Sequence, residues 1–538
     1  MKKRILFCTE SGDLSTGYGN YTRSILSRLY ATGKYDIAEL SCYKTTSTVN
    51  KFPWKIYPNA VDKKDPRYNQ YNSILQNQFG QWRFDLVVAH FKPDIVIDFR
   101  DIFMSIFQRT SVFRNKFQWI LAPTIDSFPI RSEWVDSLQN CDILLTHTYW
   151  AKTEIENNYG IKVHDVVQDS IDTSIYKPLN KYAIRQSLGL LDPNAFIIGS
   201  VMRNQKRKLI PELMRVLSVL SKNNDNVYLY LHTSYPELSG WDIPKLLIEH
   251  DVYHRVLFTY ICKECNHFVP MSWKGEVYQC PKCQKQTLVL PSSSKGVDDK
   301  VLCKIYNMFD VYVQYAICEG FGIPPLEAAS CGVPFITVNH GAMKELGQNF
   351  NADLVEISQY YREQENSSDR VYPDNFDCID KLQSMIDKTE IERIRLKERC
   401  RKITLEKYSW DFTAKKFENI IDQTLNLNPE RWKPISESHF QSIKKDTPDA
   451  RNNRETIYSV VDNILEEPGL KDSFFVQSIV KAVDKGYIID SDQMMPYTLE
   501  SAIKTLEMWF NNKTFLNKFL EDNTVLKNRD FLTYPNTK

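Results

Sequence analysis

Two successive series of short aliphatic runs, each followed by a longer segment of helical periodicity, constrain the fold of this 538-residue chain most strongly. The first series has its strand-like runs at 5–8, 86–89, 94–98, 119–122 and 143–146. The second series has them at 196–202, 227–232, 256–260, 311–315 and 333–338, with helical segments at about 210–222 and 301–308. Such alternation is typical of βαβ units that form a parallel sheet. The pattern predicts two doubly wound α/β domains, separated by a polar, turn-rich stretch at about 165–195.

Two segments do not fit this alternation. One is an insertion at about 261–298 that carries four clustered cysteines. The other lies beyond about residue 430, where apolar residues recur at spacings of three and four and strand-like runs are missing. This spacing is typical of amphipathic helices, so we expect a helical extension over 430–538.

The composition indicates a folded protein with no overall charge bias, although a local basic patch is still possible. Hydrophobic residues make up 42% of the chain and charged residues 25%, as in average globular proteins. The formal net charge is only +1, which argues against non-specific nucleic-acid binding and against a polybasic membrane anchor. There is neither the long apolar core of a signal peptide nor an apolar run of about 18 residues. Together with mostly scattered cysteines, this favours a cytoplasmic protein with no transmembrane segment.

The most informative stretch runs from residue 318 to 334 and reads CEGFGIPPLEAASCGVP. Its two glycines, Gly320 and Gly322, allow the backbone to approach a ligand closely, and a proline at 324 or 325 suits the first turn of a helix. A helix N-terminus that follows a parallel strand presents free N–H groups to phosphate or sugar oxygens. Glu319 and Glu327 could accept hydrogen bonds from vicinal hydroxyl groups.

This Glu-x7-Glu stretch resembles the signature of family 4, or group 1, glycosyltransferases, which have the GT-B fold. The resemblance implies that Glu319 contacts the donor sugar, helped by the amides of Gly320, Phe321 and Gly322. It also implies that Glu327 holds the ribose hydroxyls of the nucleotide. The alternative is a well-packed loop and helix start with two solvated glutamates.

A basic run follows the first strand of the second series. Arg203 and Lys208 resemble the family's diphosphate clamp, in which a guanidinium fork and a mobile ammonium neutralise the leaving pyrophosphate. The Gly that usually follows the lysine is replaced by Leu209. On its own, such a cluster could equally be a solvated loop.

A glycine-containing loop follows the first strand. Gly17 and Gly19 are similar to the family's Gly-rich loop near the donor phosphates. The loop lacks the third glycine of a dinucleotide fingerprint, which argues against an NAD-dependent oxidoreductase.

The segment 122–129 stands where many relatives carry a His that faces the reacting sugar. It contains no His here, so Asp126 is the candidate for that catalytic role, with an ordinary helix cap as the alternative.

The inserted cysteines have the spacing of a zinc ribbon. Cys262 and Cys265 form one Cys-x2-Cys pair, and Cys280 and Cys283 form another after fourteen residues. Four thiolates can bind zinc tetrahedrally and stabilise a loop too small to fold alone. Since all four ligands come from the protein, the zinc should be structural; two redox pairs or free thiols are the alternatives.

The resemblance implies a GT-B architecture, in which two Rossmann-like doubly wound domains face a cleft. The acceptor-side domain would comprise 1–180 and the nucleotide-sugar domain 181–424, with a last helix at about 408–424 that packs back on the first domain. The zinc ribbon would occupy 261–290 and the helical extension 430–538.

The expected function is that of a cytoplasmic hexosyl- or pentosyltransferase. It would move a sugar from a nucleotide-diphosphate donor to an acceptor hydroxyl, with retention of the anomeric configuration and without a catalytic divalent metal. The acceptor could be a glycan, a lipid-linked saccharide, a protein or a modified nucleic acid. The alternatives are a protein that binds or modifies nucleic acid through the ribbon and the tail, and an inactive sugar-binding or assembly protein.

Overall fold

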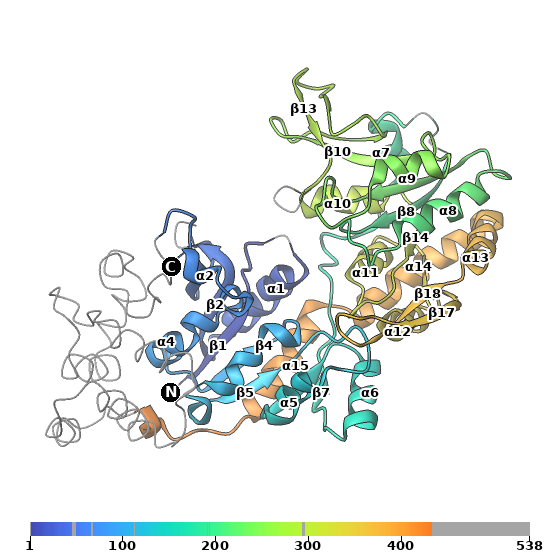
Figure 1. Ribbon diagram of the computed structural model, residues 1–538. Coiled ribbons are helices and arrows are strands. Elements are labelled where there is room, and N and C mark those ends of the chain that lie inside the picture. Colours follow the sequence, from blue (N-terminus) through green and yellow to red (C-terminus); the bar gives the residue numbers. More distant parts are fainter. Residues whose placement is uncertain are drawn as a thin grey trace, which may run out of the picture. The chain divides into compact units, whose positions relative to one another are not determined.

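The computed structural model describes residues 2–432, except residues 15, 46–49, 66–67, 112, 191, 193 and 293–295 (Figure 1). The helical extension predicted over 430–538 lies outside the described residues beyond Trp432. The chain divides into two compact units. Unit 1 contains Met1–Pro123, Ser132–Leu145 and the described residues from Phe417 onward, and unit 2 contains Thr124–Arg131 and Thr146–Lys416.

The first sheet has seven strands in the order β3-β2-β1-β4-β5-β6-β7, and its pairs from β3 to β6 are parallel. The strands are β1 (Lys3–Glu10), β2 (Tyr35–Thr45), β3 (Lys55–Ala60), β4 (Ile95–Asp98), β5 (Gln118–Leu121), β6 (Ile143–Thr146) and β7 (Asp165–Val166). Residues 5–8 of the central strand β1 are fully buried, because helices cover both faces of such a sheet. This is the doubly wound order predicted from the first series.

The helices of this part of the chain are α1 (Gly17–Ala31), α2 (Tyr68–Tyr71), α3 (Leu75–Phe79), α4 (Gln81–Phe91), α5 (Ser132–Asn140) and α6 (Tyr149–Tyr159). The strand predicted at 86–89 is wrong, because these residues lie within α4. Trp82, Phe84, Val87 and Val88 are all buried there, so an apolar run too continuous to show helical periodicity still forms a helix.

The second sheet has the order β12-β13-β10-β9-β8-β14-β15-β16, and β11 also pairs with β10. The parallel strands are β8 (Phe196–Val201), β9 (Val227–His232), β10 (Val256–Cys262), β14 (Val311–Gln314), β15 (Phe335–Val338) and β16 (Asp353–Val355). The antiparallel strands β11 (Phe268–Ser272), β12 (Val277–Gln279) and β13 (Gln286–Val289) belong to the cysteine insertion. The five strands of the second series are thereby confirmed.

The order of the parallel strands reverses between β8 and β14. Ligands of doubly wound sheets bind beyond the carboxyl ends of strands at such a switch point. The basic run after β8 and the glutamate stretch after β14 both begin there.

The helices of the second half are α7 (Lys181–Ser187), α8 (Ile210–Leu220), α9 (Ile243–Glu249), α10 (Asp299–Tyr306), α11 (Ile323–Ser330), α12 (Gly341–Phe350), α13 (Asn375–Asp387), α14 (Glu390–Lys407) and α15 (Trp410–Gln423). A hairpin of β17 (Ile357–Arg362) and β18 (Asp369–Pro373), which the strand pattern does not predict, precedes α13. Among the described helices, none has the length and apolar character needed to cross a membrane.

The second half of α15 packs within unit 1. The Phe417 ring lies 6.3 Å from the ring of Tyr21 on α1, and Glu418 pairs with Lys34. The ammonium of Lys3 on β1 donates to the carbonyl oxygen of Thr424 at 2.9 Å. These contacts fasten the first strand and the first helix to residues more than 380 positions away in the chain.

The centre of β8 depends on a glycine for packing. A Cβ atom on Gly199 would lie 2.0 Å from the ring of the buried Phe309, whereas no described atom lies within 4 Å of a Cβ on Gly296. We expect Gly199→Ala to lower the free energy of unfolding by about 1–3 kcal/mol through overpacking. Urea unfolding of this variant beside Gly296→Ala measures the difference; equal midpoints for the two variants would contradict it.

Candidate active site and cysteine metal site

Glu319 follows β14 and is the centre of a buried ionic cluster. Its Oε2 accepts a hydrogen bond from Nη1 of Arg207 at 2.9 Å, and its Oε1 accepts one from Nε2 of Gln314 at 2.6 Å. The ammonium of Lys208 is paired with the same Oε1. Two cations and one neutral amide therefore satisfy a carboxylate that is almost completely shielded from solvent.

The neighbouring charges decide the ionisation of this cluster. Burial raises the pKa of Glu319, but the charges of Arg207 and Lys208 outweigh burial and bring that pKa down to about 2. Burial lowers the pKa of Lys208, while the charge of Glu319 raises it. Glu319 is thus an anion throughout the physiological range.

Backbone hydrogen bonds join the loop after β8 to the loop after β14. The N–H of Leu209 donates to the carbonyl oxygen of Tyr315 at 3.1 Å, and that of Ile317 donates to Arg207 at 3.0 Å. Between these two bonds Lys208 forms an antiparallel bridge with Ala316. Because the two loops follow adjacent parallel strands, Lys208 is brought directly to the Glu319 side chain.

Arg203 does not join this cluster. Its Nη2 lies 3.3 Å from Oε2 of Glu237, and 56% of its side chain is exposed. Arg207 contacts Glu319 instead, a residue that the resemblance does not single out. Its place in the basic run 203–208 is the one sequence signal that could have identified it.

The loop from Gly320 to Gly322 is tightly constrained. A Cβ atom on Gly320 would lie 2.0 Å from the methyl group of Thr124, and Gly322 has φ +117° at the N-cap of α11. A proline occupies the first turn of α11, as predicted. The Phe321 ring is buried 6.2 Å from the ring of Tyr408, so its side chain belongs to the core and only its backbone can face a ligand.

Glu327 lies on α11 in a different environment from Glu319. Its Oε2 accepts a hydrogen bond from the hydroxyl of the buried Tyr306 at 2.5 Å. Burial is the largest influence and raises the pKa of Glu327 to about 8. Tyr312 is buried near both glutamates. Burial and the negative charges of Glu319 and Glu327 raise the pKa of its hydroxyl.

Asp126 is the candidate on the acceptor side, and the structure places it beside the glutamate loop. Its Oδ1 lies 3.0 Å from Nη1 of Arg370, and its Oδ2 lies 3.4 Å from Sγ of Cys318. Since α5 begins at Ser132, Asp126 is too far upstream to cap that helix.

Gly17 and Gly19 belong to unit 1, where they open α1 directly after the loop that follows β1. The side chain of Thr16 caps the helix by accepting from the N–H of Gly19. The hydroxyl of Tyr18 donates to Oδ1 of Asp101 at 2.9 Å. The first turn of α1 therefore follows a central strand of its sheet, as α11 does in the second sheet.

The four inserted cysteines come together. Their sulfur atoms all lie within 4.8 Å of one another, with 3.5 Å between Cys262 and Cys283 and 3.7 Å between Cys265 and Cys280. Four sulfurs at about 2.3 Å from a tetrahedral ion would be about 3.8 Å apart, so the donor set fits such an ion. The distances exclude disulfide bonds in this arrangement.

The cysteine cluster is continuous with the second sheet. Cys262 is the last residue of β10, and Cys280 packs in the same core as Trp273 and Leu288. Burial raises the pKa of the Cys262 thiol, but hydrogen bonds from the backbone N–H of Cys265 and from Thr287 bring it down to about 5. A metal ion bound there would stabilise an extension of the sheet.

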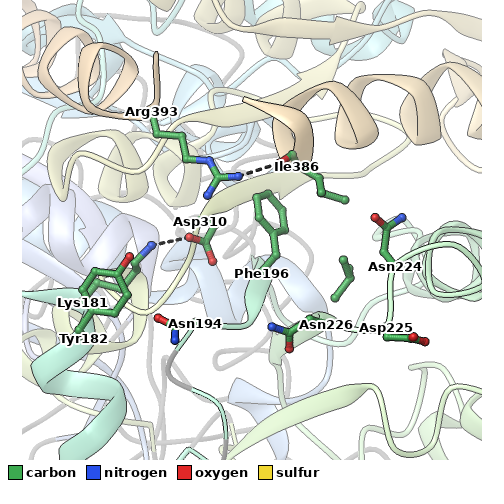
Figure 2. A pocket seen from close by; sticks show the side chains of 11 residues that line it. Lys181, Tyr182, Asn194, Phe196, Asn224, Asp225, Asn226, Asp310, Ile386 and Arg393 are labelled. Atoms are coloured by element: carbon green, nitrogen blue, oxygen red, sulfur yellow. Dashed lines mark hydrogen bonds and ion pairs between the residues drawn. The ribbon is translucent and has the colours of Figure 1, made fainter. Parts of the chain in front are cut away.

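Figure 2 shows a separate cavity of about 380 Å³ at the amino ends of central strands of the second sheet. It is lined by residues at the starts of β8 and β9 and by Asp310, which precedes β14. Lys181 pairs with Asp310 at 2.5 Å, and Arg393 donates to the carbonyl oxygen of Ile386. No predicted site residue lines this cavity, so the carboxyl ends of β8 and β14 remain the candidate site.

The two glutamates should contribute differently to stability between pH 4.5 and pH 8. Because the native pKa of Glu327 is raised from 4.5 to about 8, the wild-type protein loses stability as the pH rises through that interval. Glu327→Gln should therefore be more stable than wild type at pH 8, and the difference should shrink toward pH 4.5. Glu319→Gln leaves Lys208 and Arg207 without their anion and should be less stable at both values. Thermal unfolding of both variants across this range measures the effect; a difference for Glu327→Gln that does not change with pH would contradict it.

The comparisons with known proteins agree with this geometry. Residues 293–386, which include both glutamates, match the family of glycosyl transferases group 1. A D-inositol 3-phosphate glycosyltransferase of Rhodococcus jostii (strain RHA1) is 23% identical over 217 residues. That match spans 40% of this chain and 41% of the relative, which is less than half of either protein.

Solved structures share the architecture. Sucrose-phosphate synthase from Thermosynechococcus elongatus has a TM-score of 0.57 and 15% identity, and the match covers 78% of this chain and 99% of that protein. Anabaena Alr3699/HepE in complex with UDP-glucose has a TM-score of 0.51 and 13% identity, with 78% and 100% covered. Such likeness shows the fold alone. The chain thus has the α/β GT-B fold, and its residues 293–386 match the group 1 glycosyl transferases, the family that its Glu-x7-Glu stretch resembles.

Proposed function

We propose that the protein transfers a sugar from a nucleotide-diphosphate sugar to an acceptor hydroxyl, with retention of the anomeric configuration. The observation that carries the proposal is the buried cluster of Glu319, Lys208 and Arg207 at the switch point of the second sheet. A carboxylate paired with two cations beside a helix N-terminus offers acceptors for sugar hydroxyls and donors for phosphate oxygens. The group 1 match over residues 293–386, which include Glu319, supports this reading.

Two basic side chains, Arg203 and Lys208, would bind the diphosphate of the donor. Arg203 is joined only to Glu237 among its described ionic partners, and its exposed side chain can turn toward a diphosphate. Lys208 would share its charge between Glu319 and that diphosphate. Positive charge at this place stabilises the leaving pyrophosphate as the glycosidic bond breaks. Arg203, Lys208 and helix amides would supply this charge, so no catalytic divalent metal is required.

The nucleotide is expected next to α11. The backbone amides of residues 320–322 would contact the donor sugar, and Glu327 would accept from the ribose hydroxyls in place of the Tyr306 hydroxyl. The UDP-glucose bound by the similar Anabaena protein supports a nucleotide hexose as the first donor to test. Gly17 and Gly19 at the start of α1 would approach the donor phosphates.

Asp126 would face the reacting sugar from the acceptor side. Forty per cent of its side chain is exposed although it is paired with Arg370, so it remains accessible to an acceptor. A glycan, a lipid-linked saccharide, a protein or a modified nucleic acid could supply the hydroxyl. A cytoplasmic location is supported by the twelve cysteines, none of which forms a disulfide among the described residues.

The cysteine cluster is proposed to hold structural zinc. Its four sulfur donors, their spacing and their near-tetrahedral distances suit Zn²⁺, and four protein ligands leave no open position for catalysis. When bound, the ion would contribute folding energy to the inserted strands rather than reactivity.

Donor turnover tests the proposal. UDP-glucose, GDP-mannose and ADP-glucose would be screened for stabilisation of the protein and for nucleoside diphosphate release. We expect Arg203→Ala and Glu319→Gln each to reduce release by about 10²-fold or more, because Arg203→Ala removes positive charge at the leaving diphosphate and Glu319→Gln removes the carboxylate that would contact the donor sugar and that pairs with Lys208. Arg215→Ala is the matched control, since Arg215 is equally exposed and is paired with Glu212 on α8. Full turnover in both site variants would overturn the assignment.

Metal content tests the zinc site. Purified protein should contain one equivalent of zinc, and Cys280→Ser should lose most of it and unfold at a lower temperature. Cys141→Ser should retain the metal, because Cys141 lies at the end of α5, outside the cluster. A zinc-free wild-type protein with an intact second sheet would contradict the prediction.

A further inference from the structure

The β17–β18 hairpin is an element that neither the glutamate stretch nor the metal site explains. Its backbone contacts two segments that are remote in sequence. The N–H of Asp369 donates to the carbonyl oxygen of Phe128 at 2.7 Å, and the N–H of Val371 donates to that of Ile317 at 3.3 Å. The hydroxyl of Ser368 donates to the carbonyl oxygen of Pro129 at 2.9 Å. The hairpin thus joins the segment of Asp126 to the segment of Glu319.

Arg370 on β18 is the side chain at the centre of this junction. Only 5% of its side chain is exposed, and its Nη1 lies 3.0 Å from Oδ1 of Asp126. Its Nη2 and Nε donate to Oε2 of Glu363 at 2.8 and 3.0 Å, and Nη1 also donates to the hydroxyl of Ser127. Because the guanidinium is planar and rigid, these contacts fix the orientations of the Asp126 and Glu363 carboxylates.

The segments that the hairpin joins also touch each other. Sγ of Cys318 lies 3.4 Å from Oδ2 of Asp126, and the methyl group of Thr124 fills the space where Gly320 would carry a Cβ atom. Residues 124–131 accordingly belong to unit 2, although they continue from a strand of the first sheet. Asp126 is therefore held by the unit that carries Glu319.

We propose that Arg370 is a positioning residue for the acceptor side, which holds Asp126 at a fixed place beside the Cys318–Gly320 segment. This inference rests on the proposed glycosyl transfer. Its consequence is that the carboxylate facing the acceptor and the carboxylate facing the donor sugar keep a constant spacing. Misplacing a reacting group by about 1 Å can cost on the order of 10²-fold in rate. Donor affinity should change little, because Arg203, Lys208 and Glu319 do not contact Arg370 in the described pairs.

Hydrogen exchange of the full chain tests the positioning without any need for turnover. Arg370→Gln should make the amides of 124–131 exchange about tenfold faster, because the loss of charge-assisted hydrogen bonds releases this segment. Arg362→Gln is the matched control, since Arg362 lies on the same hairpin and pairs with Asp369 while 55% of its side chain is exposed. Equal exchange over 124–131 in the two variants would overturn the proposal. Arg370→Lys keeps the charge but not the fork, and should show the same faster exchange if Arg370→Gln fails to fold.

A double-mutant cycle then tests the functional part. Asp126→Asn, Arg370→Gln and the double variant would be compared for nucleoside diphosphate release from UDP-glucose, GDP-mannose and ADP-glucose. If Arg370 acts through Asp126, turnover should fall by about the same factor in all three variants, with unchanged donor binding. Losses that multiply in the double variant, or donor binding lost in parallel, would overturn the positioning role. A wild-type protein that releases nothing from any of these donors would instead overturn the proposed function, while the exchange comparison still decides whether Arg370 holds the segment.

Discussion

The buried carboxylate of Glu319 depends on the two cations that accompany it, and the arrangement of the candidate site follows from that dependence. An ion removed from water is stable only when charges of opposite sign and hydrogen bonds replace its hydration. Lys208 and Arg207 come from the loop after β8, while Glu319 comes from the loop after β14. Satisfying one carboxylate therefore requires two loops to close on each other, and the backbone bonds between 207–209 and 315–317 show how they do so.

The two glutamates of one motif lie in opposite electrostatic environments. Glu319 is surrounded by positive charge, whereas Glu327 is surrounded by phenols and by the charge of Asp299. The same residue type can thus offer a permanent anion at Glu319, before α11, and a carboxyl that readily holds a proton at Glu327, eight positions further on. Sugar hydroxyls act both as donors and as acceptors, so a pair of carboxyl groups in these two states can engage both kinds of partner.

Much of the fold could be predicted because strands buried on both faces read as uninterrupted aliphatic runs, and β1, β8 and β14 are of this kind. The same rule failed at 86–89. These residues belong to helix α4, which is so largely buried that its apolar residues form a continuous run like that of a strand. The family resemblance also singled out Lys208 and Glu319, which the structure brings into contact, and the spacing of the four inserted cysteines predicted that they would lie together, as they do. The sequence could not identify Arg207 or Arg370. Each pairs with a carboxylate that is more than 100 positions away in the chain, and such a contact cannot be read from a basic residue in a loop or a hairpin.

The cysteine insertion also changes which strand lies at the edge of the second sheet. Without the insertion, β10 would be the last strand of the parallel sheet, with its backbone groups free on the side away from β9 (Figure 1). Strand β11 pairs along that side from Leu257 to Ile261, whereas β13 pairs with Ile261 and Cys262 on the other side of β10, beyond the end of its pairing with β9. Unpaired sheet edges invite intermolecular strand pairing and aggregation. The insertion therefore does more than carry four cysteines: its strand β11 covers the backbone groups that β10 would otherwise expose.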